Sequence, residues 1–224
     1  MNTDVARFNM IEQQIRPWNV LDPQVLKSLS LLPREKFVPA AYQALAFADV
    51  EIPLADTATA RSSGLMMLPP RLDARLVQSG DIKPSDKVLE VGTGSGYMAA
   101  LLATQAAQVI SVELVAEQAA RARQNLAAAG IGNVQVEVGD GLPGWAAQAP
   151  YDVIVLSGGV SHVPQELLKQ LRPGGRLIAM VGDESLMQVQ RISCASTGVF
   201  SSTNLFETAA PMLKCAQAES TFEF

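Results

Sequence analysis

The stretch KVLEVGTGSGY, residues Lys87–Tyr97, decides how this chain is expected to fold. Residues Val88–Val91 form a short apolar run that is typical of a buried strand, and Glu90 is its only charge. A glycine then occupies every second position: Gly92, Gly94 and Gly96. Glycine tolerates positive φ and carries no side chain, so the turn can be tight and a ligand can approach the backbone closely. The residues after the turn, Tyr97–Thr104, are expected to form a helix.

The order of strand, glycine turn and helix favours a pocket for a nucleotide-like cofactor. Free backbone N–H groups and the positive end of the helix dipole point at a ligand above such a turn. The dinucleotide fingerprint G-x-G-x-x-G is not met, because the sixth position counted from Gly92 is Tyr97. The pattern E-x-G-x-G-x-G instead resembles the first motif of S-adenosylmethionine (SAM) methyltransferases. A tight turn without a ligand is the plain alternative.

A second acidic residue strengthens this prediction. Glu113 follows Gly96 by seventeen residues and ends an apolar run that starts at Val109. An acid at the tip of the second strand can accept hydrogen bonds from both ribose hydroxyls. The residues of this region that we expect to hold S-adenosyl-L-methionine are Glu90, Gly92, Thr93, Gly94, Ser95, Gly96, Glu113 and Leu114.

From Lys87 onward, strand-like and helical patterns alternate, which predicts a doubly wound parallel sheet. Strands are expected at Lys87–Val91, Gln108–Glu113, Val134–Val138, Tyr151–Ser157 and Gly175–Val181. Helices are expected at Tyr97–Thr104, Val115–Ala129, Pro164–Leu171 and near Leu142–Ala147. The segment Met187–Leu205 adds two β segments joined near Ser196–Gly198. The predicted fold class is α/β, a Rossmann-like SAM methyltransferase fold with a seven-stranded sheet and an N-terminal helical cap.

The N-terminal part is expected to be mainly helical. Residues Thr3–Ile15 place apolar side chains at helical spacing, and Pro17 is expected to end this helix. Asp22 followed by Pro23 opens a second helix. Residues 1–80 are thus expected to form a helical cap and substrate loop. Residues 81–224 are expected to form the SAM-binding α/β domain, packed with the cap as one compact unit.

The substrate loop has two parts. Residues Ala55–Gly64 are small and polar, which predicts a loop. Residues Leu65–Leu68 are apolar and are expected to pack into the core rather than line a pocket, because methionine runs usually fill gaps. Pro70 can then occupy the first position of a helix over Arg71–Gln78.

Further candidate residues lie where the later strands end, because ligands of open parallel sheets bind beyond the carboxyl ends of the strands. Asp140, next to Gly141, either accepts a hydrogen bond from the adenine amino group or caps the following helix. Ser157 opens a glycine-containing turn that either approaches the reacting centre or is a plain loop. His162 is the only histidine and is either a general base or a loop residue.

Composition excludes several classes of function. The formal net charge of −5 argues against a nucleic-acid partner, which needs a basic face. No run reaches the roughly 18 apolar residues of a membrane-spanning helix, and Met1–Arg16 lacks the apolar core of a signal peptide. Cys194 and Cys215 do not form a C-x-x-C pair, so we expect reduced thiols, no metal site and a cytoplasmic protein.

At full length the chain resembles the protein-L-isoaspartate O-methyltransferase family. The matching pieces are PREKFVP (Pro33–Pro39), VLEVGTGSGY (Val88–Tyr97), SVE (Ser111–Glu113), VGDGLPGW (Val138–Trp145), APYDVIVLSGG (Ala149–Gly159) and LLKQLRPGGRLIAMVG (Leu167–Gly182). The resemblance implies a SAM-dependent enzyme that methylates the stray carboxylate of isoaspartyl residues and so begins their repair. It also implies that Gly92, Gly94, Glu113, Asp140 and Gly141 hold SAM.

Two departures from the family fall on elements expected to hold the acceptor. The family loop GQTISQP corresponds to Gly64–Pro70, where Met66 and Leu68 replace residues that carry a hydroxyl. The family tail R-F-V-P-L corresponds to Thr208–Met212, which lacks the arginine. Arg61 or Arg71 could replace the lost charge, and Arg61 is favoured by its place in the altered loop.

The sequence therefore predicts carboxyl O-methylation of isoaspartyl residues in a protein or peptide acceptor. One alternative is a divergent methyltransferase for another, more apolar acceptor, such as a small molecule. Another is a SAM-binding protein without isoaspartyl activity. The oligomeric state is not predicted.

Overall fold

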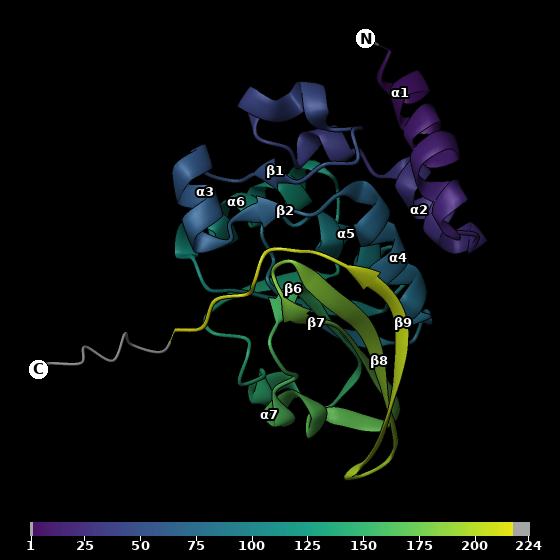
Figure 1. Cartoon of the computed structure of the whole chain (residues 1–224), viewed down its shortest axis with the longest axis vertical. Coiled ribbons are helices and arrows are strands. Elements are labelled where there is room, and N and C mark those ends of the chain that lie inside the picture. Colours follow the sequence, from purple (N-terminus) through teal and green to yellow (C-terminus); the bar gives the residue numbers. More distant parts are fainter. Residues whose placement is uncertain (1, 217–224) are drawn as a thin grey trace, which may run out of the picture.

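A seven-stranded sheet runs through the molecule, and helices cover both of its faces (Figure 1). The computed structural model describes residues 2–216. The strands are β3 (Lys87–Val91), β4 (Gln108–Glu113), β5 (Val134–Val138), β6 (Tyr151–Val160), β7 (Leu171–Asp183), β8 (Leu186–Ser196) and β9 (Val199–Thr208). Their order across the sheet is β5-β4-β3-β6-β7-β8-β9. Strands β3 to β7 pair in parallel, whereas β8 and β9 pair antiparallel.

The predicted α/β class and seven-stranded sheet are therefore confirmed. The bounds of β3, β4 and β5 are those predicted, whereas β6 and β7 are longer. Neighbouring residues of a strand face opposite sides of the sheet. Val88 accordingly belongs to the apolar core on one side, and Leu89 to the core on the other.

The main helices of the α/β part are α4 (Pro70–Gly80), α5 (Tyr97–Ala103) and α6 (Ala116–Ala128). They pack on the face that carries Val88. The opposite face is covered by the four-residue helix α7 (Gln165–Leu168) and the segment around the short 3₁₀ helix η5 (Ala146–Gln148). The helix predicted near Leu142–Ala147 is thus only a 3₁₀ turn, and it begins later than expected.

The N-terminal cap consists of α1 (Thr3–Asn9), the π-helical η1 (Met10–Ile15), the 3₁₀ turn η2 (Arg16–Trp18) and α2 (Pro23–Leu31). The predicted helix over Thr3–Ile15 is confirmed, since α1 and η1 together span these residues. Pro17 lies in the 3₁₀ turn that follows, where its missing N–H needs no partner. Asp22 caps α2 as predicted, because its side chain accepts hydrogen bonds from Gln24 N and Val25 N.

The segment before the sheet continues with η3 (Arg34–Lys36) and η4 (Ala40–Leu45), and then with strand β1 (Ile52–Pro53). The loop predicted over Ala55–Gly64 is wrong, because Thr57–Ser63 forms helix α3. The Asp56 carboxylate accepts a hydrogen bond from Thr59 N at the start of α3. Gly64, at φ +72°, ends this helix. Strand β2 (Met66–Met67) then pairs with β1.

One apolar core joins the cap to the sheet. It includes Met10 and Phe37 from the cap, Leu76 from α4, and Val88 from β3. The domain division at residue 80 therefore crosses a shared core, and residues 217–224 of the second predicted range lie outside the described residues.

No helix in the described part of the chain is long and apolar enough to cross a membrane. Cys194 is buried and Cys215 is exposed, and both are free thiols.

Candidate active site

The glycine turn after β3 forms the floor of a cavity at the carboxyl end of the sheet. The φ angles of Gly92, Gly94 and Gly96 are +95°, +52° and +85°, a region that residues with side chains rarely adopt. Glu113 holds the turn from the tip of β4. One of its carboxylate oxygens accepts a hydrogen bond from Gly94 N at 2.8 Å, and the other accepts one from Val115 N at 3.0 Å.

The walls of this cavity combine predicted and unpredicted residues. The predicted ones that line it are Gly92, Gly94, Glu113, Leu114, Gly141 and Ser157. Residues from the loops and strand ends complete it: Leu54, Leu65, Met66, Val112 and Gly139. The tail contributes Met212, Leu213 and Lys214. The N-terminal part, the sheet and the tail thus meet at one site.

The tail segment, residues 211–216, lies across the carboxyl end of the sheet. Gly159 N donates to Pro211 O, and Leu213 N donates to Gly159 O, both at 2.8 Å. Leu213 packs on the glycine turn, since a Cβ on Gly92 would lie 2.7 Å from Leu213 Cδ2. The absence of a side chain at Gly92 therefore lets the tail reach the floor of the cavity.

A chain of buried polar groups lies beneath the cavity. Glu90 is fully buried and accepts hydrogen bonds from Ser157 Oγ at 2.8 Å and from Ser111 Oγ at 2.6 Å. Ser111 Oγ in turn lies 2.5 Å from Thr93 Oγ1. Burial raises the pKa of Glu90 to about 8, although the two serine hydrogen bonds oppose this. Glu90 is therefore mainly a neutral carboxylic acid at neutral pH.

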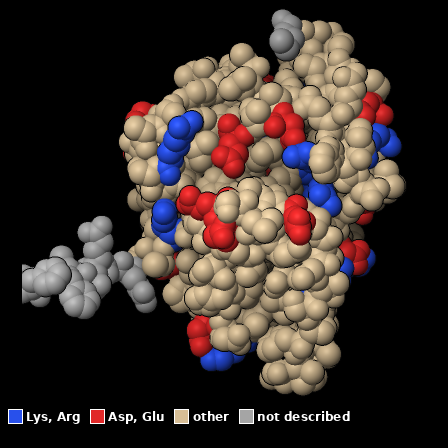
Figure 2. Space-filling view, in the orientation of Figure 1, with Lys and Arg blue, Asp and Glu red and all other residues tan. Residues whose placement is uncertain are grey.

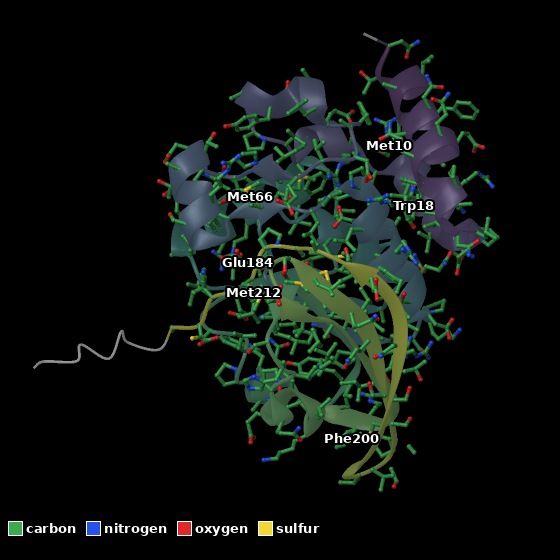
Figure 3. The ribbon with its side chains drawn as sticks, viewed as in Figure 1. Met10, Trp18, Met66, Glu184, Phe200 and Met212 are labelled. Atoms are coloured by element: carbon green, nitrogen blue, oxygen red, sulfur yellow. The ribbon has the colours of Figure 1, made fainter. Side chains whose placement is uncertain are left out.

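An open groove of about 500 Å³ lies beside the cavity and shares Gly64, Met66, Met212 and Lys214 with it. Its charged residues are Glu51, Arg61, Glu184 and Lys214. Figure 3 shows Met66 of β2, Glu184 of the β7–β8 turn and Met212 of the tail gathered on the same side of the molecule. Figure 2 shows basic and acidic side chains on both sides of a hollow between the helical part and the sheet. A volume of this size suits a small-molecule or short peptide ligand.

Several predicted residues lie outside the described lining of the cavity. Glu90 is fully buried beneath it and is linked to the cavity by the hydrogen bond from Ser157 Oγ. Asp140 accepts hydrogen bonds from Leu142 N at 2.9 Å and from Ala216 N at 2.8 Å, and it is absent from the described lining of the cavity. These hydrogen bonds hold the turn and anchor the tail, and a part of Asp140 in binding the cofactor stays a prediction. Gly96 packs against α6, where a Cβ would lie 3.3 Å from Leu126 Cγ.

His162 is exposed, and its Nδ1 lies 3.1 Å from Ser161 Oγ. It is absent from the described lining of the cavity and of the groove, so its predicted role as a general base lacks a geometric basis. Thr93 and Ser95 are buried and line a small secondary cavity behind Met66 and Leu68.

The apolar run 65–68 lies partly in the core and partly in the wall of the cavity. Met67 and Leu68 are buried, as expected for core residues, whereas Leu65 and Met66 line the main cavity. Sequence reasoning missed the tail residues Leu213 and Lys214. Their only signal was the position of the tail beyond the last strand, which does not reveal where the tail folds back.

Comparison with known proteins agrees with this geometry. Residues 6–209 match the family model described as protein-L-isoaspartate(D-aspartate) O-methyltransferase. A relative of that name from Methanoculleus marisnigri is 40% identical over 186 residues, which cover 83% of this chain and 81% of the relative. One from Koribacter versatilis is 43% identical over 180 residues, which cover 80% of this chain and 78% of the relative.

Solved structures give the same result. A protein-L-isoaspartate O-methyltransferase is similar with a TM-score of 0.79 and 25% identity, covering 95% of this chain and 66% of that chain. A Plasmodium falciparum protein, solved with S-adenosyl-L-homocysteine, has a TM-score of 0.75 and 18% identity, and the match covers 96% of this chain and 99% of that one. At this identity the second likeness supports the fold alone. The extent of the family match and the identity to its relatives show that this chain belongs to the protein-L-isoaspartate(D-aspartate) O-methyltransferase family.

Proposed function

We propose that this protein transfers a methyl group from SAM to the free carboxylate of isoaspartyl residues in proteins and peptides. Its family makes it a SAM-dependent O-methyltransferase, and the acceptor is the finer part of the proposal. The observation that carries the proposal is that the two spaces adjoin. The cavity over the glycine turn shares Met66 and Met212 with the groove that holds Arg61 and Lys214.

The residues around the glycine turn fit the cofactor. At Gly92 and Gly141 the chain's own packing requires glycine, because a Cβ would lie 2.7 Å from Leu213 Cδ2 and 2.8 Å from Val91 Cγ1 respectively. Glu113 lines the cavity at the tip of β4, where a carboxylate can accept hydrogen bonds from ribose hydroxyls. When bound, SAM supplies a methyl group activated by a positively charged sulfonium. Gly92, Gly94, Glu113, Leu114 and Gly141 are the residues that would hold it.

The protein's own task in the reaction is mainly placement. A carboxylate acceptor has a pKa of about 4 and is already ionised at neutral pH, so it needs no general base. Orientation within the cavity and exclusion of water lower the barrier instead. The exposed position of His162, away from the cavity, is compatible with this chemistry.

Arg61 and Lys214 supply positive charge at the entrance of the groove. Both are exposed, and neither forms an ion pair among residues 2–216. Arg71, the other arginine near the loop, is bound to Asp49 at 3.1 Å and lies over the Trp18 ring. Arg61 and Lys214 are therefore the cations of the groove that can pair with an acidic acceptor, and Glu51 and Glu184 are the carboxylates that share the groove with them.

The direct test is methyl transfer from labelled SAM to an isoaspartyl peptide, with the matching aspartyl peptide as control. Label on the isoaspartyl peptide alone supports the proposal. Label on neither peptide, in protein that binds SAM, contradicts it. Arg61→Ala and Lys214→Ala should each raise the KM for the peptide, whereas Lys27→Ala, which removes an exposed lysine of α2, should not. Unchanged acceptor kinetics in Arg61→Ala would remove that residue from the proposal.

A second candidate function is methylation of a more apolar acceptor. Met66 and Met212 line both the cavity and the groove, and Leu68 lies buried near Met66. Activity on small apolar acids or phenols, without activity on isoaspartyl peptides, would favour this candidate. SAM binding without turnover on any acceptor would favour a non-enzymatic role.

We also infer a cytoplasmic location, as the sequence predicts. The two free thiols support this inference, because disulfides are rare in that compartment. Detection of the protein in a fractionated cell extract would test it.

A further inference from the structure

Ser157 is placed to act on a ligand in two adjoining spaces. It lines the main cavity over the glycine turn, and it lines the small cavity behind Met66 and Leu68. Its side chain is only partly exposed, so a hydrogen bond made there is shielded from water. The other described hydroxyl of the main cavity, that of Ser63, donates to Thr59 O at 2.5 Å within α3.

The ionisation state of Glu90 decides the direction in which the Ser157 hydroxyl can donate its hydrogen bond. If Glu90 is ionised, it accepts hydrogen bonds from both Ser157 and Ser111, and the Ser157 proton points away from the cavity. If Glu90 is neutral, its own proton can be donated to Ser157 Oγ, which lies 2.8 Å away. The Ser157 hydroxyl is then free to donate upward, and an anionic oxygen above it favours this arrangement.

The charged groups that face Glu90 raise its pKa, as burial does. Asp73 of α4 and Glu113 of β4 both disfavour the ionised form of Glu90. Asp73 is paired with Arg34 at 2.7 Å, and Glu113 is held by two backbone N–H groups. Ser111 and Thr93 are neutral. No lysine or arginine of residues 2–216 forms an ion pair with Glu90.

We propose that Ser157 donates a hydrogen bond to a ligand carboxylate in the cavity, and that Glu90 positions it by donating its own proton to Ser157 Oγ. This inference rests on the proposed function for its ligands, because both the isoaspartyl acceptor and the methionine part of the cofactor carry a carboxylate. The serine would supply a hydroxyl in a region where Met66 and Leu68 supply none.

The test measures two affinities by calorimetry between pH 6 and pH 9.5 (about the range in which Glu90 titrates). One is for S-adenosylhomocysteine, and the other is for an isoaspartyl peptide added to that complex. Ser157→Ala should weaken one of them by about tenfold, the typical effect of losing a hydrogen bond to a charged group. Ser157→Thr should restore it, and Ser201→Ala, an exposed serine on β9, should have no effect.

The pH dependence of the affinity distinguishes a positioning role of Glu90 from a merely structural one. In the wild type, the affinity that depends on Ser157 should fall as the pH rises through about 8, because Glu90 ionises there. In Glu90→Gln the side-chain amide donates at every pH, so this dependence should disappear. Titration of isotope-labelled glutamate carboxyl carbons by NMR reads the ionisation of Glu90 directly in the wild type, without a variant.

The two affinities, one for S-adenosylhomocysteine and one for the isoaspartyl peptide, separate the possible outcomes. Loss of peptide affinity assigns the acceptor carboxylate to Ser157, and loss of S-adenosylhomocysteine affinity assigns the cofactor carboxylate. No change in either arm, or ionisation of Glu90 near 4.5, overturns the inference. A wild type that binds S-adenosylhomocysteine but methylates no isoaspartyl peptide refutes the proposed function, whereas the cofactor arm and the NMR titration still decide the role of Ser157.

Discussion

Glu90 shows what burial does to a single carboxyl group in this fold. Its pKa rises from 4.5 to about 8, mainly because burial penalises the charged form. Between these two values the folded state binds one proton more than the unfolded state does. The free energy of unfolding therefore falls as the pH rises through this window, by about 1.4 kcal/mol per pH unit.

Glu90→Gln should remove this loss of stability, because glutamine does not titrate. We expect the melting temperature of the variant to rise relative to that of the wild type as the pH is raised from 5 to 8 (about three decades in proton concentration). Thermal unfolding at three pH values in this range measures the gap. A gap that stays constant with pH would show that Glu90 ionises normally in the folded state.

Glu113 is also buried, but it lines the cavity, and its carboxylate accepts hydrogen bonds from the backbone groups Gly94 N and Val115 N. Glu113→Gln keeps the shape of the side chain but removes the charge that a ribose hydroxyl would meet. We expect S-adenosylhomocysteine to bind at least about tenfold more weakly, since a hydrogen bond to a charged group contributes about 1.5–3 kcal/mol. Calorimetry measures this, with Glu117→Gln on the exposed side of α6 as control. Equal affinities in the wild type and Glu113→Gln would exclude Glu113 from cofactor binding.

At the scale of elements, the end of α3 and the tail form one contact over the cavity. Gly64 ends α3 at φ +72°, and a Cβ there would lie 2.8 Å from Met212 O. The neighbour is a backbone atom rather than the flexible end of a side chain, so the contact cannot relax cheaply. Helix α3 and the tail can therefore approach each other only because residue 64 is glycine.

Gly64→Ala should push the tail away from α3. We expect faster amide hydrogen exchange over residues 211–216 and weaker binding of S-adenosylhomocysteine, because Met212, Leu213 and Lys214 line the cavity. Gly130→Ala is the matched control, since Gly130 has a similar φ of +74° and a Cβ there would meet nothing within 4 Å. Unchanged exchange in the tail of Gly64→Ala would mean that this contact does not hold the tail in place.

At the scale of the whole molecule, Arg34 joins the cap to the α/β part. Its side chain is fully buried and donates to Ala46 O at 3.0 Å, to Asp73 Oδ2 at 2.7 Å and to Leu68 O at 2.7 Å. The guanidinium also lies 4.6 Å from the centre of the Tyr97 ring. One side chain thus connects the N-terminal part, the loop before α4, α4 itself and the first helix after the glycine turn.

Arg34→Met should lower the free energy of unfolding by about 3–5 kcal/mol, because it leaves Asp73 buried without its partner. Urea denaturation measures this loss, and a single transition is expected because the cap and the sheet share one core. Lys169→Ala, which breaks an exposed pair with Glu166, should change stability by no more than about 1 kcal/mol. Two separate transitions in the wild type would contradict the view that the cap and the sheet fold together.

The sequence by itself determined the sheet and the floor of the site. The apolar runs at Lys87–Val91 and Gln108–Glu113 predicted β3 and β4 with the observed bounds, because strand patterns are local in the chain. The glycine turn and Glu113 were likewise readable, since positive φ values and strand tips are local features. Helix α3 was missed, because its small polar residues show no helical period and only Asp56 and Gly64 mark its ends.

The tertiary structure alone decided which groups line the cavity. Leu213 lies on Gly92, and Ala216 donates to Asp140, although these partners are far apart in sequence. The exposure of His162 and the complete burial of Glu90 also depend on elements remote from them. A sequence pattern records the period and local conformation of a segment, whereas burial, and with it a shifted pKa, is set by everything that packs around a residue.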